Sequence, residues 1–317
     1  MDSVALIAPD FAIILLGLLL RTKLRYSEDF WKSAERLVFY VLFPPLLFTS
    51  IAGSNLSLGS SAKFLMVGIG TMLLGIAAAW CVRYLVKADA VTHASLFQCG
   101  FRFNTYIGFA LVLKLFGDEG FALLALLIAF WVPISNTIAV AVLADAVEKR
   151  DAAQGLGAAA GGRPNLLLKT AKAVLKNPLI IATILGLACN LLNATVPMPV
   201  HHFLEDLGKA SLAMGLLCIG AGLRFSELKN ALGLLTAGTV ERLVVLPAIA
   251  CATVSIFGLG PAAAGVVLIF AALPTAQSCY VMTAAMRGNA SAVAGATTMQ
   301  TLAAMATLPL WISAAIL

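Results

Sequence analysis

The sequence predicts an all-α integral membrane protein with ten transmembrane helices arranged as a 5+5 inverted repeat. Of its 317 residues, 61% are hydrophobic and only 11% are charged, whereas soluble domains carry about 25% charged residues. The mean hydropathy of the chain is +0.98. A further observation, a set of matched positions about 170 residues apart, indicates the repeat and its inversion.

Each predicted helix is an apolar stretch between polar or charged joints, and a bilayer span needs roughly 20 such residues. In chain order the stretches are 4–20, 37–51, 64–86, 91–115, 121–143, 178–192, 204–223, 232–257, 262–286 and 292–316. Basic residues follow the first stretch and do not precede it, whereas a cleavable signal peptide carries its positive charge in front. We therefore expect the first stretch to remain as a helix.

Lys and Arg are distributed unequally between the two sides of the predicted bundle. The joints after the odd-numbered stretches hold 16 basic residues, from Arg21 to Arg287, and the opposite joints hold three, Lys63, Lys114 and Lys209. Cytoplasmic loops collect Lys and Arg. We therefore expect a multi-pass protein of the cell (inner) membrane with both termini outside or periplasmic. The net charge of +6 follows from this bias, and no nucleic-acid partner is expected.

The two halves of the chain share spaced residues. The matched pairs are Pro9 with Pro178, Gly17 with Gly186, Leu37 with Leu207, Thr105 with Thr275 and Gly117 with Gly288, at offsets between 169 and 171. Each unit would contain five spans. Because five is odd, the second copy must enter the membrane from the opposite side, which is an architecture of many secondary transporters.

The repeat predicts three parts of the chain. Residues 1–143 form the first five-helix repeat, residues 144–177 a cytoplasmic linker, and residues 178–317 the second five-helix repeat. The linker contains several glycines followed by RPNLLLKTAKAVLKNP, in which Lys169, Lys172 and Lys176 would share one helical face. This pattern predicts an amphipathic helix on the membrane surface.

Two spans are expected to be broken near their middle. Pro274 lacks an N–H and clashes with the preceding turn, so it should interrupt the span 262–286. In the span 91–115, Gly100 and Asn104 flank Arg102, and Asn readily leaves helical geometry to bond local backbone. Broken helices of inverted-repeat carriers cross near the midplane and aim positive half-helix ends at a shared site, which favours an anion.

Arg102 is the predicted charge anchor of that site. A guanidinium keeps its charge and can bind a carboxylate through two parallel hydrogen bonds. An alternative is that Arg102 only holds its helix to neighbouring carbonyls or to Glu241, since membrane arginines normally face a partner or a cavity. Further candidates for substrate binding at the same level are Asn104, Thr105, Tyr106, Thr275, Gln277 and Ser278, with Asn136 of the next span. Ser and Thr in membrane helices also often bond their own turn.

Other chemistry finds little support in the sequence. Glu241 and Arg242 are adjacent and cannot face each other on a helix, so we expect structural roles with a separate partner for each. No span carries a pair of carboxylates, which argues against an antiporter built on such a pair. The six cysteines form no CxxC pair, and no Walker loop or nucleophile–base constellation is present. We therefore predict no enzyme, no catalytic residues, no cofactor and no metal site.

Three motifs resemble those of the auxin efflux carrier family in its short-loop, bacterial form. They are FRFNTYIG at 101–108, LPTAQSCYVM at 273–282 and TLPLWI at 307–312, and the resemblance covers essentially the whole chain. It implies a crossover fold shared with bile-acid symporters and sodium/proton antiporters. Spans 1, 2, 6 and 7 would form a scaffold, and spans 3–5 and 8–10 a transport domain with an elevator-like movement. The crossover residues implied by the motifs are Asn104, Thr105, Pro274, Thr275 and Ala276.

The resemblance also implies an organic anion as substrate, which is auxin in plants and malonate or malate for some bacterial relatives. The plant pattern has a proline where Phe103 stands here and no arginine beside it, so a smaller, more strongly charged carboxylate is expected. We predict a secondary transporter of a small mono- or dicarboxylate, embedded in the lipid bilayer as a homodimer through its scaffold. The sequence leaves open whether transport is coupled to sodium, to protons or to no ion. The alternatives are a sodium-coupled symporter of the bile-acid type and a non-transporting anion receptor.

Overall fold

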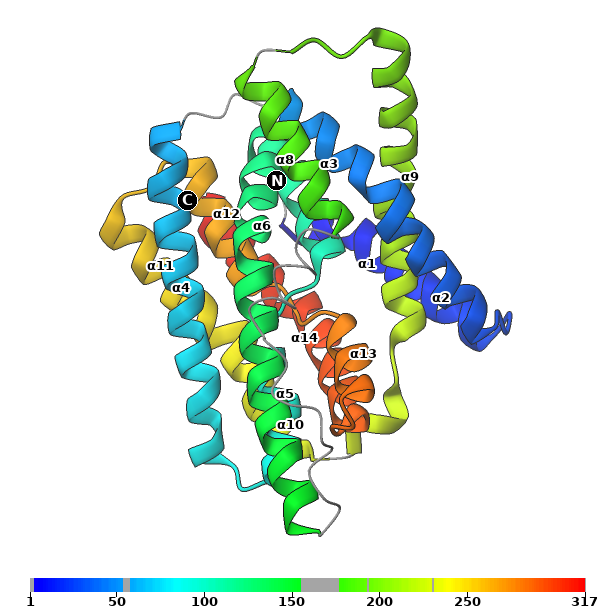
Figure 1. The fold of residues 1–317 in the computed structure, drawn as a ribbon, viewed down its shortest axis with the longest axis vertical. Coiled ribbons are helices and arrows are strands. Elements are labelled where there is room, and N and C mark those ends of the chain that lie inside the picture. Colours follow the sequence, from blue (N-terminus) through cyan, green and yellow to red (C-terminus); the bar gives the residue numbers. More distant parts are fainter. Residues whose placement is uncertain (1–2, 54–57, 155–176, 193, 230, 317) are drawn as a thin grey trace.

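The computed structural model describes residues 3–53, 58–154, 177–192, 194–229 and 231–316, and most of these residues are helical (Figure 1). Within these ranges there is no β-strand. The predicted amphipathic helix with Lys169, Lys172 and Lys176 lies outside the described residues. The all-helical class expected from the sequence is confirmed.

The described part of the first half contains eight helical elements. They are α1 (Ser3–Thr22), α2 (Glu28–Leu37), the π-helical turn η1 (Val38–Leu42), α3 (Phe43–Ala52), α4 (Leu58–Leu85), α5 (Ala90–Phe97), the 3₁₀ turn η2 (Gln98–Gly100) and α6 (Thr105–Ala153). The predicted first and third spans coincide with α1 and α4 to within a few residues.

The second half begins after the undescribed segment. Its elements are α8 (Pro178–Leu191), α9 (Met198–Gly222), the 3₁₀ turn η3 (Phe225–Lys229), α10 (Leu232–Val240), the π-helical turn η4 (Glu241–Val245), α11 (Leu246–Phe257), α12 (Pro261–Ala272), α13 (Ser278–Ala285) and α14 (Ala290–Ile316). The predicted spans at 178–192, 232–257 and 292–316 match α8, the α10–α11 unit and α14 closely.

The second span begins earlier than predicted, at residue 28 and not at residue 37. Ser27 caps α2, because its Oγ accepts a hydrogen bond from the Phe30 N–H at 3.1 Å. Glu28 and Asp29 in the first turn favour a helix N-terminus. The π-helical turn η1 then carries the helix into Pro44 and Pro45 at the start of α3, so α2, η1 and α3 form one apolar unit, Glu28–Ala52.

Helix α6 contains a sharp turn that separates two predicted spans. Gly117 has φ 59° and ψ −153°, a backbone conformation that residues with a Cβ rarely adopt. The segment before this turn completes the span predicted at 91–115, and the segment after it holds the span predicted at 121–143. The second segment continues to Ala153, about ten residues beyond the predicted end.

Several helices are long and apolar enough to cross a bilayer. Among the described residues, five such segments meet this requirement by length and composition: Val4–Thr22, Glu28–Ala52, Ala62–Leu85, Ala90–Ala153 and Leu232–Phe257. Large apolar side chains such as Met66, Leu74 and Leu185 are more than half exposed on these and neighbouring helices. A surface of this kind suits lipid and not water, so the chain is a multi-pass membrane protein.

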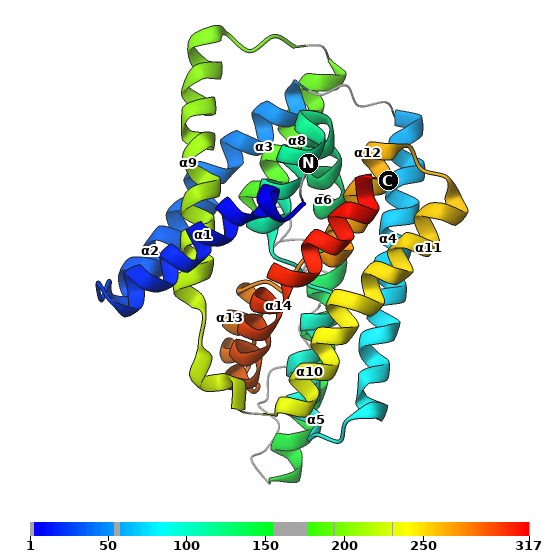
Figure 2. The ribbon, with the colours of Figure 1, turned by 180° about the vertical axis from the view of Figure 1, so that it is seen from behind.

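The helices form two groups with α6 between them. In Figures 1 and 2, α1, α2, α3, α8 and α9 lie on one side, and α4, α11 and α12 lie on the other. Helices α1 and α9 cross at glycines. A Cβ at Gly17 would overlap the Leu217 carbonyl, and a Cβ at Gly220 would overlap the Ile14 carbonyl. Close backbone approach through small residues is a common way for membrane helices to associate.

This crossing predicts a local sensitivity to side-chain volume. We expect Gly220→Ala to destabilise the protein by about 1–3 kcal/mol, because the added methyl forces α1 and α9 apart. Gly70→Ala in α4 is the matched control, since a Cβ there meets nothing within 4 Å and alanine has the higher helix propensity. Thermal unfolding of the detergent-purified variants measures both effects. Equal melting temperatures for the two variants would contradict the close packing.

Candidate functional site

The first break follows α5 and η2. Residues 101–104 are not helical, and Asn104 restarts the helix as the N-cap of α6. Its side-chain Oδ1 accepts hydrogen bonds from the N–H groups of Tyr106 at 3.1 Å and Ile107 at 3.3 Å. The local bonding expected of Asn104 therefore accounts for the position at which the second half-helix begins.

The second break separates α12 from α13. Residues 273–276 are not helical, with Pro274 among them, and the two breaks contact each other directly. The Asn104 N–H donates a hydrogen bond of 2.8 Å to the Pro274 carbonyl, and the Thr275 N–H donates to Gln300 Oε1 at 3.0 Å. Backbone groups left free by the interruptions are thus satisfied across the crossing.

Arg242 of η4 bonds backbone carbonyls on both sides of the crossing. Its Nε donates to the Leu273 carbonyl at 2.7 Å and its Nη2 to the Phe270 carbonyl at 3.2 Å. Its Nη1 lies 3.5 Å from the Gly100 carbonyl, and the residue is 0% exposed. One guanidinium therefore satisfies carbonyls at the ends of both interrupted helices, which agrees with the structural role expected for Arg242.

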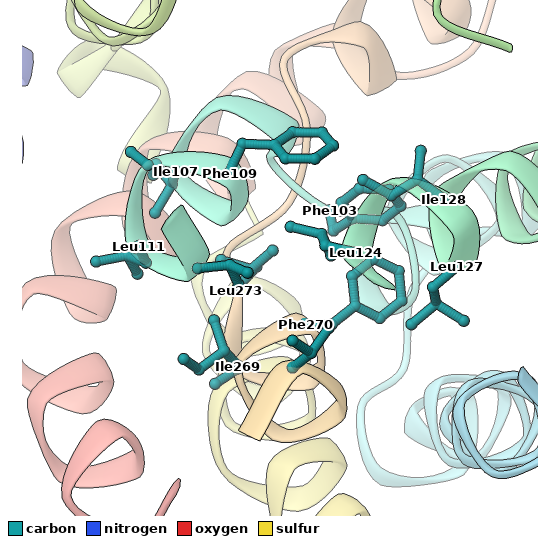
Figure 3. Close-up of a cluster of buried hydrophobic side chains, with 14 of the residues drawn as sticks. Phe103, Ile107, Phe109, Leu111, Leu124, Leu127, Ile128, Ile269, Phe270 and Leu273 are labelled. Carbon is teal, nitrogen blue, oxygen red and sulfur yellow. The ribbon is translucent and has the colours of Figure 1, made fainter. Parts of the chain in front are cut away.

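Apolar side chains hold the crossing rigidly. Figure 3 shows Phe103 and Leu273 of the two breaks and Phe270 of α12 packed near Leu124 and Ile128 of α6. The rings of Phe103 and Phe270 have centroids 4.4 Å apart. Well-packed rings of this kind limit movement of the flanking polar residues.

Arg102 is 9% exposed, and its contacts in the described residues are neutral. Nη1 donates to Gln98 Oε1 at 2.8 Å, and Nη2 donates to Ser278 Oγ at 2.9 Å. Nη1 also approaches Met282 Sδ at 3.8 Å. Among these contacts of the guanidinium there is no ion pair to Glu241 and no bond to a backbone carbonyl, which were the alternative anchoring partners proposed for Arg102.

Arg102 faces a cavity of about 270 Å³. The polar residues around it are Arg102, Thr105, Ser135, Asn136, Asn177 and Ser278. A second cavity of about 110 Å³ adjoins it and adds Glu35, Asn104, Tyr106 and Gln277, while Ala276 lines both. Most of the predicted site residues, including Asn136 from the next span, therefore line these two adjoining cavities.

Two of the predicted residues support the site without lining it. The Pro274 carbonyl accepts the hydrogen bond from the Asn104 N–H. Thr275 is 0% exposed, and its Oγ1 lies 3.3 Å from Cys279 Sγ. Gln277 reaches across to the other helix group, where its Nε2 donates to the Ile219 carbonyl at 2.7 Å.

A third cavity of about 100 Å³ adjoins the second, with which it shares Glu35 and Gln277. Its charged lining consists of the cations Arg21, Lys32 and Arg224 and the carboxylates Glu28 and Glu35, and Arg224 pairs with Glu28 at 3.1 Å. Shared lining residues thus place the three cavities next to one another, from Arg102 to this charged cluster.

Some lining residues were missed from the sequence. Glu35 and Phe39 lie on the α2–η1 unit, whose first turns were assigned to a loop because of their charges. Ser27 followed by Glu28 and Asp29 is a helix-start signal that could have corrected this. Asn177 and Leu179 at the start of α8 carry no signal of their own, because only the fold brings them to the crossing.

Comparison with known proteins agrees with the resemblance carried by the motifs. Residues 3–312 match the family described as "Membrane transport protein". A curated protein of Rhizobium meliloti (strain 1021), named "Putative malonate transporter", is 23% identical over 288 residues, which cover 89% of this chain and 86% of that protein. The family match spans both breaks and all the cavities described above. The chain therefore belongs to the membrane transport protein family, the family of the auxin efflux carriers.

Proposed function

We propose that the protein is a secondary transporter that moves a small organic anion of the malonate or malate type. The observation that carries this proposal is the Arg102 guanidinium, 9% exposed and bonded to Gln98 and Ser278 beside a cavity. A charge inside a membrane protein is costly unless it has a charged partner or faces water or a ligand. A carboxylate in the cavity would supply that partner.

The surroundings of Arg102 suit an anion of limited size. The N-terminus of α6 and the Ser278 hydroxyl at the start of α13 lie at the same cavity, and helix N-termini stabilise negative charge. The cavity of about 270 Å³ is smaller than the roughly 300–1,000 Å³ of pockets for drug-sized ligands. The name of the Rhizobium relative adds support for malonate. Substrate-binding roles are proposed for Arg102, Asn104, Thr105, Tyr106, Asn136, Ala276, Gln277 and Ser278, with Pro274 and Thr275 in support.

The proposal includes ten spans in two inverted repeats, residues 1–143 and 178–317, joined by the linker 144–177. Thr105 and Thr275, at an offset of 170 residues, both lie at breaks that bond each other, as expected of repeats that meet at a crossing. Both chain ends lie in the upper half of Figure 1, and the turns from α4 to α5 and from α13 to α14 lie in the lower half. This arrangement supports a topology with outward-facing termini and basic inner loops in the cell membrane.

Movement would occur between the two helix groups of Figures 1 and 2. We propose that α1, α2, α3, α8 and α9 form a scaffold, which also provides a homodimer contact, and that the remaining helices carry the substrate in an elevator-like step. Gly215 and Gly222 of α9 face Tyr106 and Gln277 of the site. A surface of small residues leaves little to interlock when one group slides past the other. Gly220, in contrast, faces Ile14 within the scaffold.

The experiment that tests the proposal is uptake of labelled malonate, malate and indole-3-acetate into proteoliposomes, with and without sodium and pH gradients. We expect saturable uptake of a small carboxylate that exceeds the signal of protein-free liposomes. Dependence on sodium would favour a symporter of the bile-acid type, and dependence on a proton gradient would favour proton coupling. Saturable binding without uptake would favour the receptor alternative and contradict the transporter proposal.

A further inference from the structure

Glu241 is a buried carboxyl that lacks a partner in the described part of the chain. It is the first residue of η4 and is 4% exposed. Neither Oε1 nor Oε2 has a hydrogen-bond partner among the described residues. The separate partner expected for Glu241 from the sequence is therefore not observed, and its role is not explained by anchoring.

A small void lies against this carboxyl. Its volume is about 20 Å³, which is enough for one water molecule. Besides Glu241 it is lined by Ala79, Val82, His93, Leu96, Phe97, Gly100, Leu234 and Gly238, from α4, α5, η2 and α10. A Cβ at Gly100 would collide with Glu241 Oε2, so the glycine makes room for the carboxyl.

The charged and titratable groups nearby do not neutralise Glu241. Arg242 is adjacent, but its guanidinium bonds the carbonyls of Leu273 and Phe270. His93 of α5 lines the void and is half-buried, and Arg83 of α4 lies over the Trp80 ring at 4.5 Å. Cys99 of η2 is buried in an apolar cluster that shares Val82, Leu96 and Leu234 with the lining of the void. No described cation forms an ion pair with Glu241, so a carboxylate buried here would have neither an ion-pair partner nor a hydrogen-bond donor among the described residues.

We propose that Glu241 is a proton-binding site of the transport cycle. This inference rests on the proposed transporter function. A proton from bulk water enters past half-buried His93, passes through the water-sized void and binds one carboxyl oxygen. On release it returns to water and leaves a carboxylate, with no other bond changed.

The position of Glu241 connects proton occupancy to the substrate site. Its carboxyl contacts Gly100, which lies two residues before Arg102 in the first break. A newly formed carboxylate would attract the neighbouring Arg242 guanidinium, which closes both breaks through carbonyls on each side. Loss of the proton therefore weakens the bonds that hold the crossing, and binding of the proton restores them.

The lining of the void favours a proton over a metal cation. Hard cations require several oxygen ligands. Among the side chains that line this void, Glu241 is the one that supplies oxygen, and the nearby Gly100 carbonyl is directed to Arg242. A proton needs one oxygen and no further ligand.

The transport test compares wild type with Glu241→Gln, which has nearly the same shape and cannot ionise. Malonate uptake into proteoliposomes is measured with inward, outward and no proton gradient. For one titrating proton we expect up to about a tenfold change in wild-type uptake per pH unit, and loss of this response in Glu241→Gln. Asp145→Asn on the exposed face of α6 removes a similar charge and should keep the wild-type response. An unchanged response in Glu241→Gln, or a sodium requirement that Glu241→Gln alone removes, would overturn the proposal.

A second readout does not need transport. Infrared difference spectra of the purified protein, recorded on a change of pH, detect the C=O stretch of a protonated carboxyl. We expect a band that titrates in wild type and Asp145→Asn and is missing in Glu241→Gln. If wild type transports none of the tested anions, the proposed transporter function fails. The infrared band then tests the proton site by itself. A titrating band supports proton binding at Glu241, and the absence of the band overturns it.

Discussion

Arg102→Gln is expected to abolish saturable anion uptake while the protein still folds. The guanidinium is the cation that faces the 270 Å³ cavity, and a bidentate charge-assisted bond to a carboxylate would be lost. Truncating one partner of a buried charge pair costs about 2–5 kcal/mol, which corresponds to roughly 30-fold or more in affinity. Folding should survive, because Gln98 and Ser278 can bond each other, the new amide or cavity water.

Arg102→Lys separates charge from geometry. A lysine keeps one positive charge but cannot form two parallel bonds, so we expect weakened uptake with a raised KM and not complete loss. Lys149 lies on the exposed face of α6 and is paired with Asp145. Lys149→Gln also removes one positive charge, but away from the cavity, so this variant should transport normally. Initial uptake rates across a range of malonate concentrations, with size-exclusion profiles of each variant, provide the measurement. Wild-type KM in Arg102→Gln would reduce Arg102 to a local anchor for Gln98 and Ser278.

The two breaks could be predicted because each has a local chemical cause. Pro274 removes a backbone N–H, and Asn104 offers a side-chain acceptor to the amides that follow it. Neither effect depends on the rest of the fold. In the sequence, Gly117 stands out only as a position matched with Gly288, and the structure uses its positive φ for the turn between two apolar stretches.

The start of α2 could not be predicted from hydropathy, because its first turns carry charges on most positions. Its stability comes from Trp31 and Ala34, which are buried against neighbouring helices, a tertiary effect that outweighs local polarity. The error has a functional consequence. It left Glu35 outside the predicted bundle, although this residue lines both the second and the third cavity.

The partners of the buried charges were the least predictable part of the site. Gln98 precedes Arg102 by one helical turn and was within reach of local reasoning. Ser278, the other partner, comes from the opposite half of the chain, and only the crossing of the two breaks brings it near. Likewise, Thr275 was predicted to bind substrate, but the fold turns it toward Cys279 and Gln300. Contacts of this kind follow from the relative placement of helices, which periodicity does not determine.

Arg242→Met is expected to cause a larger loss of stability than Gly220→Ala or either substitution of Arg102. Methionine fills similar space but donates no hydrogen bond, so the carbonyls of Leu273, Phe270 and Gly100 would lose their donor in a buried setting. Each buried carbonyl left without its donor costs about 1–3 kcal/mol. Thermal unfolding in detergent measures the loss, with Arg242→Lys expected to retain part of the stability.

Arg83→Met is the matched control, because Arg83 is exposed and its described contacts are the rings of Trp80 and Tyr84. Loss of such a contact at an exposed site costs about 0.5–1 kcal/mol. A melting temperature of Arg242→Met equal to that of Arg83→Met would contradict the role assigned to Arg242. The two arginines at the crossing are thereby separated by experiment. Arg102→Gln should fold and lose uptake, and Arg102→Lys should fold with weakened uptake. Arg242→Met should lose folded protein first, because the Arg242 guanidinium bonds backbone carbonyls on both sides of the crossing.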